Sequence, residues 1–373
     1  MKKIIIVSYS FPPCNLTAAQ RAMSWFEYFN EYNIYPIIIT RNWDIPIERP
    51  SDVYKTTGKK VEHHKTEKGE IYYLPYKGNF ASRLYSKNQQ NFVFLRKAMT
   101  LLELILQPYI QVVVPIRNIF QFTQQIISEQ KDIEYAIITA NPFILFKLGY
   151  MLNKRTGIKW IADYRDDWTT DELKKKKSII EKLLHKQDRY FEKKWVSTAA
   201  YFTTISEHYK NKISAIIHKP GYVIYNGYNK SEMPVIQSQP YTDKFTIIYN
   251  GTLYNTQKIE TFLKAYKQLR QEEKYKNKIQ LKFIGLGYNK EQTARLHDFF
   301  NSDLESIEIT DRIGRSEILD IQNKCHLFLM IGHQHIRGVA SSKIYEYLSL
   351  KKPILLCHGD DDILDTLVRI TEK

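Results

Sequence analysis

The chain has 373 residues, 43% of them hydrophobic, and a formal net charge of +15 at pH 7. This length exceeds the range over which one hydrophobic core usually grows, so two domains are expected, and the apolar content excludes a disordered chain. No apolar run is long enough to predict a transmembrane helix, and the three scattered cysteines form no disulfide or zinc framework, which favours a reducing compartment such as the cytoplasm.

Short apolar runs alternate with helix-like segments, a pattern typical of α/β proteins with parallel sheets. The first run, residues 4–7, is too short for a signal sequence and ends at polar residues and Pro12-Pro13, so we interpret it as a strand. Further strands are predicted in the first part of the chain at 37–39, 136–139, 160–162, 202–205 and 223–225. Those predicted in the second part lie at 245–249, 281–284, 307–309, 327–330 and 354–356.

Residues 92–127 are unusually apolar but contain Arg96, Lys97 and Arg117. This composition suits an interfacial amphipathic element beside a membrane. It equally suits helices that pack under the sheet. The same two interpretations apply to the run Lys174–Lys177, which precedes a predicted amphipathic helix and is either a membrane contact or a solvated flank.

The segment ADYRDDW, residues 162–168, follows a predicted strand, where ligands of such sheets bind. Asp166 is the candidate for the carboxylate that orients or deprotonates an acceptor hydroxyl, and Arg165 for a group that holds a neighbouring carboxylate or a phosphate. Alternatively, Asp166 or Asp167 caps a following helix and Arg165 forms a structural ion pair. A metal site would need a third ligand, which the spacing does not supply.

A polar, proline-containing stretch at 228–244 suits an interdomain linker. We therefore predict two doubly wound, Rossmann-like domains, residues 1–230 and 231–373. The first holds 35 Lys and Arg against 21 Asp and Glu, whereas the second holds 20 against 19. Such a field favours an anionic partner, and because nucleic-acid-binding motifs are missing we expect a membrane surface or a phosphorylated compound instead of nucleic acid.

Two glycine-containing turns follow strands of the second domain. In YNGTLYNTQK, Gly251 would let the backbone approach a phosphate and Lys258 could reach it. Gly285 and Gly287 form a second turn, which is equally suited to a tight strand-to-helix connection. His333 and His335 follow a later strand and are candidates for sugar or base contacts, although two histidines alone make no zinc site.

The most informative segment is GVASSKIYEYL, residues 338–348, which opens a predicted amphipathic helix. Ser341 and Ser342 can cap the helix, whose free N–H groups attract phosphate oxygens. Lys343 in the first turn opposes the helix dipole, which is explained if a dianionic group lies opposite it. Glu346 lies on a neighbouring part of that face and could accept hydrogen bonds from vicinal hydroxyls such as those of ribose. A capped helix with a solvated lysine is the simpler alternative.

The order of FPP, ADYRDDW, TTIS, VIYNGYN, YNGTLY, GLG and SSKIYEYLSLKKPIL resembles the group 1 (family 4) glycosyltransferases of the GT-B fold. The likeness covers most of the chain and is most specific at SSKIYEYLSLKKPIL and ADYRDDW. It is closest to the subset that has a lysine-containing donor segment.

This resemblance implies two Rossmann-like domains that face each other across a cleft, and retaining transfer of a sugar from a nucleoside diphosphate sugar to a glycan or lipid-linked acceptor. Glu346 would bind the ribose, and Lys258 would neutralise the diphosphate with help from Lys343. Gly251 and Thr252 would lie beside it, as would Gly285, Gly287, Ser341 and Ser342. Neither a metal nor a cofactor is expected. Surface polysaccharide synthesis at the inner face of a bacterial membrane is the implied setting.

The sequence departs from the family pattern at several places. Gly338 stands where many members have a glutamate, Thr252 where an arginine commonly follows the glycine, and residues 14–19 contain no glycine. Relatives also continue into a helix that crosses back to the first domain, whereas this sequence ends shortly after its last strand. These departures leave a non-catalytic sugar-nucleotide binding protein as an alternative. A nucleotide-sugar epimerase of the same fold is a further alternative, but the sequence shows no convincing pair of acid and base residues for it.

Overall fold

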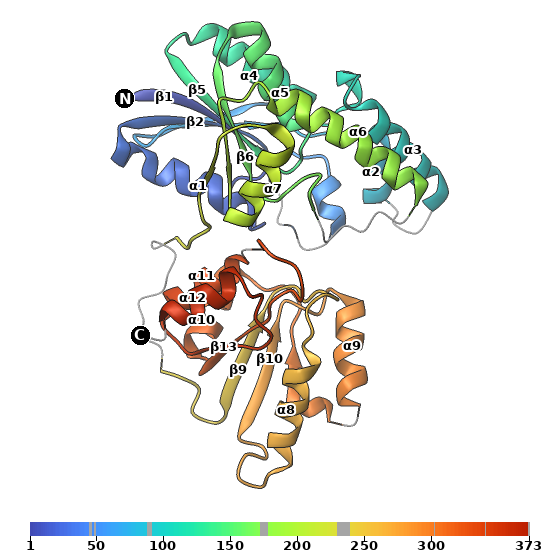
Figure 1. The fold of residues 1–373 in the computed structure, drawn as a ribbon, viewed down its shortest axis with the longest axis vertical. Coiled ribbons are helices and arrows are strands. Elements are labelled where there is room, and N and C mark those ends of the chain that lie inside the picture. The colour runs from blue at the N-terminus through green and yellow to red at the C-terminus, as the bar shows by residue number, and fades with distance from the viewer. Residues whose placement is uncertain are drawn as a thin grey trace. The chain divides into compact units, whose positions relative to one another are not determined.

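The computed structural model describes residues 1–44, 47, 50–87, 92–171, 178–229, 239–301, 303–339 and 341–371. The chain divides into two compact units, residues 1–225 (unit 1) and 226–373 (unit 2), both drawn in Figure 1. Most of the predicted linker and the Lys174–Lys177 run lie outside the described residues.

Unit 1 is built on an eight-stranded sheet with the strand order β3-β4-β2-β1-β5-β6-β7-β8. All neighbours pair in parallel except β3 and β4. The strands are β1 (Lys2–Ser8), β2 (Ile34–Arg41), β3 (Glu62–Lys65), β4 (Glu70–Leu74), β5 (Ile133–Ala140), β6 (Lys159–Tyr164), β7 (Tyr201–Thr204) and β8 (Gly221–Val223).

The helices of unit 1 connect these strands. They are α1 (Ala18–Tyr28), α2 (Phe80–Lys87), α3 (Val93–Leu106), α4 (Arg117–Glu129), α5 (Leu145–Thr156), α6 (Ile179–Val196) and α7 (Glu207–Ile217). Local sequence fixes several ends. Ser178 and Glu181 form a reciprocal capping box at the start of α6, and Gly157 ends α5 in the left-handed conformation.

The central strand β1 is buried on both faces, which explains its continuous apolar run. On one face Ile4 and Ile6 pack with Trp25 and Phe26 of α1. On the other face α4 contacts β2, and α5 contacts β5 and β6. The strand at residues 4–7 is therefore confirmed as the centre of a doubly wound sheet.

The sequence prediction missed β3 and β4 and placed the last strand of unit 1 too late. All four residues of β3 are exposed, and no apolar run marks that strand because it lies at the sheet edge. The last strand ends at Val223, before most of the predicted 223–225.

The apolar stretch 92–127 contains two helices of different character. α4 buries Ile119, Phe120 and Ile126 under the sheet, as one of the two interpretations proposed. α3 buries only Glu103 among its described residues, and most of its apolar side chains are exposed. α4 therefore fits the interpretation of a helix packed under the sheet, whereas α3 does not.

Unit 2 has a five-stranded parallel sheet with the order β11-β10-β9-β12-β13. Its strands are β9 (Phe245–Asn250), β10 (Ile279–Ile284), β11 (Ile307–Ile309), β12 (Leu327–Met330) and β13 (Ile354–Leu356), close to the predicted ranges. Its helices are α8 (Glu260–Gln271), α9 (Lys290–Phe300), α10 (Arg315–Lys324), α11 (Ser342–Ser349) and α12 (Ile363–Thr371).

Successive residues of β9 face opposite sides of this sheet. Ile247 and Tyr249 pack with residues of α8 and α9, whereas Ile248 packs with residues of α10, α11 and α12. Helices therefore cover both faces, and the carboxyl ends of β9, β10 and β12 are left to the loops that follow them.

Candidate active site

The most unusual side chain of unit 2 is Lys343 in the first turn of α11. Its ammonium, on a partly buried side chain, donates hydrogen bonds to the Tyr249 hydroxyl at 3.0 Å and to the Thr252 carbonyl at 2.9 Å. It also lies 4.2 Å from the centre of the Tyr249 ring. Burial lowers the pKa of Lys343 to about 7, and the charge of Glu346 offsets part of this effect.

Gly251 explains how the loop after β9 passes so close to this lysine. Its φ of +81° lies in the left-handed region, and a Cβ atom there would approach Lys343 Cε to 3.3 Å. A side chain at this position would therefore be strained and would crowd the ammonium. The glycine thus shapes the pocket that holds Lys343.

Glu346 lies on the same helix, partly buried. One of its oxygens, Oε2, accepts a hydrogen bond from Arg315 Nη1 at 2.5 Å. The other, Oε1, is buried and accepts no hydrogen bond from the described residues. A buried acceptor without a donor is costly and is usually filled by a ligand or water, so this oxygen is available to a hydroxyl group.

Loops after the strands meet around these residues. The Thr252 hydroxyl lies 3.0 Å from the Tyr288 hydroxyl, which follows the Gly285–Gly287 turn. His333 Nδ1 lies 2.7 Å from the Thr256 hydroxyl. Burial and the charge of the neighbouring Lys343 lower the pKa of His333 to about 4, so its ring is neutral at physiological pH.

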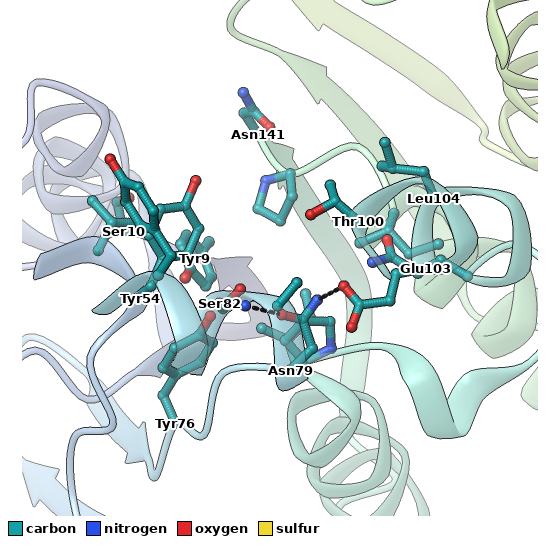
Figure 2. Close-up of a pocket in the computed structure, with 18 of the residues that line it drawn as sticks. Tyr9, Ser10, Tyr54, Tyr76, Asn79, Ser82, Thr100, Glu103, Leu104 and Asn141 are labelled. Atoms are coloured by element: carbon teal, nitrogen blue, oxygen red, sulfur yellow. Dashed lines mark hydrogen bonds between the residues drawn. The ribbon is translucent and has the colours of Figure 1, made fainter. Parts of the chain in front are cut away.

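In unit 1 the main feature is a cavity of about 1040 Å³. Figure 2 shows its lining: Tyr9 and Ser10 from the loop after β1, Tyr54 and Tyr76 from neighbouring loops, and Thr100, Glu103 and Leu104 from α3. Arg96, Lys97 and Arg165 supply basic groups. Glu103 accepts a hydrogen bond from Asn79, and burial raises its pKa. The lining therefore combines hydroxyls, aromatic rings and an excess of cations.

The ADYRDDW segment places its acidic residues in three different environments. Arg165 lines the cavity and forms an ion pair with Asp166 at 2.6 Å, but Asp166 is half exposed and does not itself line the cavity. Asp167 is buried, where it pairs with Lys212 at 3.2 Å and accepts a hydrogen bond from Thr170. Burial raises the pKa of Asp167, and Lys212 opposes this effect.

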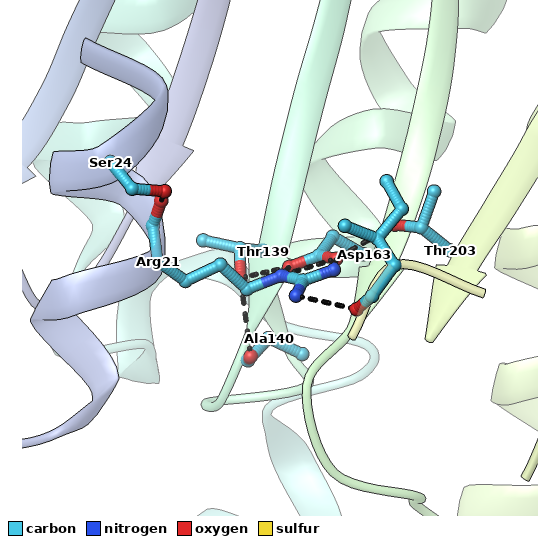
Figure 3. Close-up of polar contacts among 7 residues, drawn as sticks. Arg21, Ser24, Thr139, Ala140, Asp163 and Thr203 are labelled. Carbon is cyan, nitrogen blue, oxygen red and sulfur yellow. Dashed lines mark hydrogen bonds and ion pairs between the residues drawn. The ribbon is translucent and has the colours of Figure 1, made fainter. Parts of the chain in front are cut away.

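Asp163, the first of these carboxylates, is completely buried and fully satisfied. Figure 3 shows Arg21 of α1 reaching it with two nitrogens, at 2.8 to 3.1 Å, while the hydroxyls of Thr139 and Thr203 each donate to it at 2.7 Å. Arg21 also donates to the Ile224 carbonyl at 3.0 Å. This network joins α1 to three strands and to the last residues of unit 1.

The described residues contain no group of three or more His, Cys, Asp or Glu side chains arranged to hold a metal ion. Across the same residues, no helix combines the length and apolarity needed to cross a bilayer.

No protein-family model matches the sequence, and no curated protein matches it. Solved structures do resemble this chain. A sucrose-phosphate synthase from Thermosynechococcus elongatus superposes with a TM-score of 0.60 at 11% identity, covering 96% of this chain and 82% of that one. An α,α-trehalose-phosphate synthase (UDP-forming) from Burkholderia xenovorans, in complex with glucose-6-phosphate, superposes with a TM-score of 0.56 at 10% identity, covering 99% of this chain and 91% of that one. HepE from Anabaena, in complex with UDP and glucose, superposes with a TM-score of 0.55 at 10% identity, covering 100% of this chain and 90% of that one.

The chain has the GT-B fold. The predicted α/β class with two Rossmann-like units is thereby confirmed. At these low identities the likeness concerns the fold alone, and the residues that act within it are argued from their own geometry.

Within this GT-B chain the structure gathers some of the predicted donor residues and separates others. Gly251, Thr252, Lys343 and Glu346 lie around one cluster, with the Gly285–Gly287 turn joined to it through Tyr288. Lys258 is exposed, whereas the preceding residue, Gln257, is buried. Its amide donates to the Ile331 carbonyl at 2.7 Å.

The predicted side-chain cap at α11 was wrong in one detail. Ser341 is the N-cap residue, but its side chain makes no capping hydrogen bond. Ser342 is the first residue of the helix itself. The serine at the cap therefore leaves the N–H groups of the first turn without the side-chain acceptor that the sequence suggested.

Sequence reasoning missed Tyr249, Gln257, Thr256 and Arg315 as members of the cluster. Tyr249 was the one that could have been found, because it belongs to the YNGTLY segment and ends a strand of the predicted donor domain. Arg315 meets Glu346 from a different helix, and no local pattern connects the two.

Proposed function

We propose that this protein is a retaining glycosyltransferase that moves a sugar from a nucleoside diphosphate sugar to a hydroxyl of a glycan or lipid-linked acceptor. The observation that carries the proposal is that α11 presents an ammonium without a counter-charge beside a carboxylate oxygen without a donor. Lys343 is a partly buried cation with no ion-pair partner among the described residues, and Glu346 holds a buried oxygen without a donor. A pyrophosphate and a ribose hydroxyl would satisfy both at once.

In this proposal the diphosphate lies between Lys343 and the start of α11. The leaving group gains negative charge as the glycosidic bond breaks, so a fixed cation and helix N–H groups lower the barrier more than they stabilise the bound donor. Glu346 Oε1 accepts a hydrogen bond from the ribose. The neutral ring of His333 is available to a sugar hydroxyl, and Lys258 is the exposed second cation for the diphosphate. In this proposal Lys343 neutralises the diphosphate without the help of a metal ion.

We assign the acceptor to the cavity of unit 1. Arg165 contacts the acceptor, and Asp166, which Arg165 holds, is the candidate for receiving the proton of the attacking hydroxyl. The neighbours support a sugar acceptor and a uridine nucleotide as the first ligands to test, because one is described in complex with glucose-6-phosphate and another with UDP-glucose. We place the activity in surface polysaccharide or lipid-linked glycan synthesis.

The experiment compares the two candidate lysines. Lys343→Met and Lys258→Met each remove one ammonium but keep the aliphatic chain. We expect Lys343→Met to weaken UDP-sugar affinity about 30- to 100-fold, the loss of a desolvated charged hydrogen bond of about 2–3 kcal/mol. Lys258→Met should cost only about 1 kcal/mol or less because its side chain is exposed. Calorimetric titration with UDP-, GDP- and ADP-sugars measures both. Equal effects of the two substitutions would contradict the assignment.

Turnover is measured separately from binding. Donor hydrolysis and transfer to sugar acceptors, followed by nuclear magnetic resonance of the anomeric proton, reports both activity and stereochemistry. An inverted product would contradict retention. The Asp166→Asn substitution should lower the turnover rate while leaving donor affinity unchanged, because Asp166 belongs to unit 1.

A non-catalytic sugar-nucleotide binding protein is the second candidate, and Gly338 is the observation that favours it. This residue, which stands where the resemblance expects a glutamate, has a φ of +83° and donates its N–H to Asp362 at 2.7 Å. A glutamate would be strained at this φ, so the backbone conformation here suits glycine and not the glutamate of the family pattern. Tight nucleotide binding without turnover of any donor would favour this candidate.

A further inference from the structure

Helix α3 has two dissimilar faces. Arg96, Thr100 and Glu103 point to one side and line the unit 1 cavity. Phe94, Leu95, Leu102 and Ile105 lie on the opposite side by helical periodicity, and all four are exposed, Phe94 to 87%. One helix therefore forms the wall of the cavity and carries an apolar stripe on its outer surface.

Helix α6 extends this stripe. Gln187 of α6 donates hydrogen bonds to the Leu104 and Ile105 carbonyls at 3.2 and 3.3 Å, and the Tyr109 ring meets Phe191 edge to face. Figure 1 shows α3 and α6 side by side in unit 1. By helical periodicity the exposed apolar residues of α6 share a side of that helix with Gln187, which contacts α3. We call the combined surface the α3–α6 face: Phe94, Leu95, Leu102, Ile105, Ile179, Ile180, Leu183 and Tyr190.

Basic side chains border this face. The exposed cations of α6 are Lys182, Lys186, Arg189, Lys193 and Lys194. By helical periodicity all but Lys194 lie along one edge of the apolar stripe, and Lys194 lies within it, 5.7 Å from the centre of the Tyr190 ring. α6 also carries three acidic residues: Glu181 is exposed in the first turn, Asp188 is partly buried and Glu192 is buried, and by helical periodicity all three lie away from the apolar stripe. Glu103, the acidic residue of α3, is buried. The charge beside the apolar surface is therefore mostly positive.

We propose that the α3–α6 face docks onto the surface of an anionic lipid bilayer. Apolar side chains on adjoining helices, bordered by lysines, are the arrangement by which helices lie in a bilayer interface. Anionic headgroups complement the cations, and the phenylalanine, leucine and isoleucine side chains enter the acyl boundary. The charge argues against a second copy of the chain as the occupant, since two identical basic borders would repel each other.

The proposal also names the class of acceptor, and in this respect it rests on the proposed function. Because α3 lies between the cavity and the face, docking brings the basic cavity to the membrane surface. The acceptor is then a membrane-borne molecule whose polar, anionic headgroup enters the cavity while its lipid stays in the bilayer.

The test is co-sedimentation of the full chain with vesicles of phosphatidylcholine alone and of equimolar phosphatidylcholine and phosphatidylglycerol. We expect at least about tenfold tighter binding to the anionic vesicles, weakened by salt, because each basic residue near the surface contributes about fivefold. Phe94→Asp and Lys186→Glu should each weaken that binding about tenfold or more. Their controls are Leu269→Asp and Lys264→Glu, exposed residues of the same types on α8 of unit 2.

Equal recovery with both vesicle types would overturn the proposal, as would equal effects of Phe94→Asp and Leu269→Asp. Concentration-dependent dimerisation abolished by Phe94→Asp, without vesicle binding, would assign the face to a second copy. No donor is present in this assay, so its failure leaves nucleotide binding at Lys343 intact. All variants should keep the melting temperature of the unmodified chain and its shift with UDP, which shows that they remain folded.

Discussion

Each unit of this protein buries charged side chains at the carboxyl ends of its parallel strands, but the two units treat them differently. In unit 1 the Asp163 carboxylate meets a bidentate arginine and two threonine hydroxyls, and no oxygen is left over. In unit 2 the Lys343 ammonium meets only a hydroxyl and a carbonyl, and Glu346 has an oxygen with no donor. The first arrangement is complete without a ligand, whereas the second is not.

This difference separates a structural role from a binding role. A buried ion pair that satisfies all its hydrogen bonds holds parts of the fold in register, and Arg21 does so between α1 and Ile224. A buried charge without a counter-charge costs stability, and such a cost is commonly found where a ligand supplies the missing partner. Asp163 lies within β6, one residue before its end, and does not follow the strand as the sequence predicted; its environment makes it a structural residue.

The largest expected effect tests the complete network. Asp163→Asn leaves Arg21 buried without a counter-charge and should destabilise unit 1 by about 3–5 kcal/mol. The same change at Asp166, whose pair with Arg165 is half exposed, should cost about 1 kcal/mol or less. Urea unfolding followed by tryptophan fluorescence measures both. Similar costs for the two substitutions would remove the distinction drawn between them.

Glu192 is an intermediate case, buried with hydrogen bonds but without a cation. Tyr164 and Thr169 donate to it, and burial raises its pKa from 4.5 to about 7. The folded state therefore binds this proton more tightly than the unfolded chain does. The resulting stabilisation is complete below pH 4.5 and is lost as the pH rises through 7.

Glu192→Gln imitates the protonated form at every pH. It should make unit 1 more stable than the unmodified chain at pH 8, by on the order of 2 kcal/mol, with little difference at pH 5. Urea titrations at both pH values measure this. The exposed Glu207→Gln is the control and should change neither value. If Glu192→Gln instead destabilised unit 1 at pH 8, as Asp163→Asn is expected to do, the Glu192 carboxylate would be needed in its charged form.

The incomplete cluster should make donor binding depend on pH. Lys343 has a pKa of about 7 in the free protein, and a bound pyrophosphate would raise it, so binding takes up a proton above pH 7. Donor affinity should then fall as the pH rises from 7 to 9, by at most about tenfold per pH unit. Calorimetric titration in buffers of different ionisation enthalpy detects the proton. Lys343→Met should abolish the pH dependence. A dependence that persists in this variant would come from another group.

The fold was largely predictable from the sequence, and the elements that the prediction missed or left ambiguous are explained by their burial. The buried strands of both units have continuous apolar runs because parallel strands are covered on two faces. β3 lies at the sheet edge and is exposed throughout, so it lacks this signal, whereas β4 lies between β3 and β2 and was missed although it is largely buried. The apolar helix α3 was ambiguous for the complementary reason, since apolarity alone does not reveal which helices find a partner.

For the candidate site, sequence identified Lys343 and Glu346 because both lie within one segment of a helix start. It placed Lys258 and Lys343 on equal terms, although one is exposed and the other partly buried. It also favoured Asp166 without distinguishing the environment of Asp163. Burial depends on residues distant in the chain, and no local spacing reports it.

Sequence by itself determined where the strands of the core run and which loops follow them, because periodicity and turn residues are local properties of the chain. Only the tertiary structure decided which charges are satisfied: Arg21 and Asp163 are 142 positions apart, and Arg315 and Glu346 are 31 apart. A hydrogen bond requires atoms within about 3 Å, and over such separations this proximity is fixed by packing instead of by spacing.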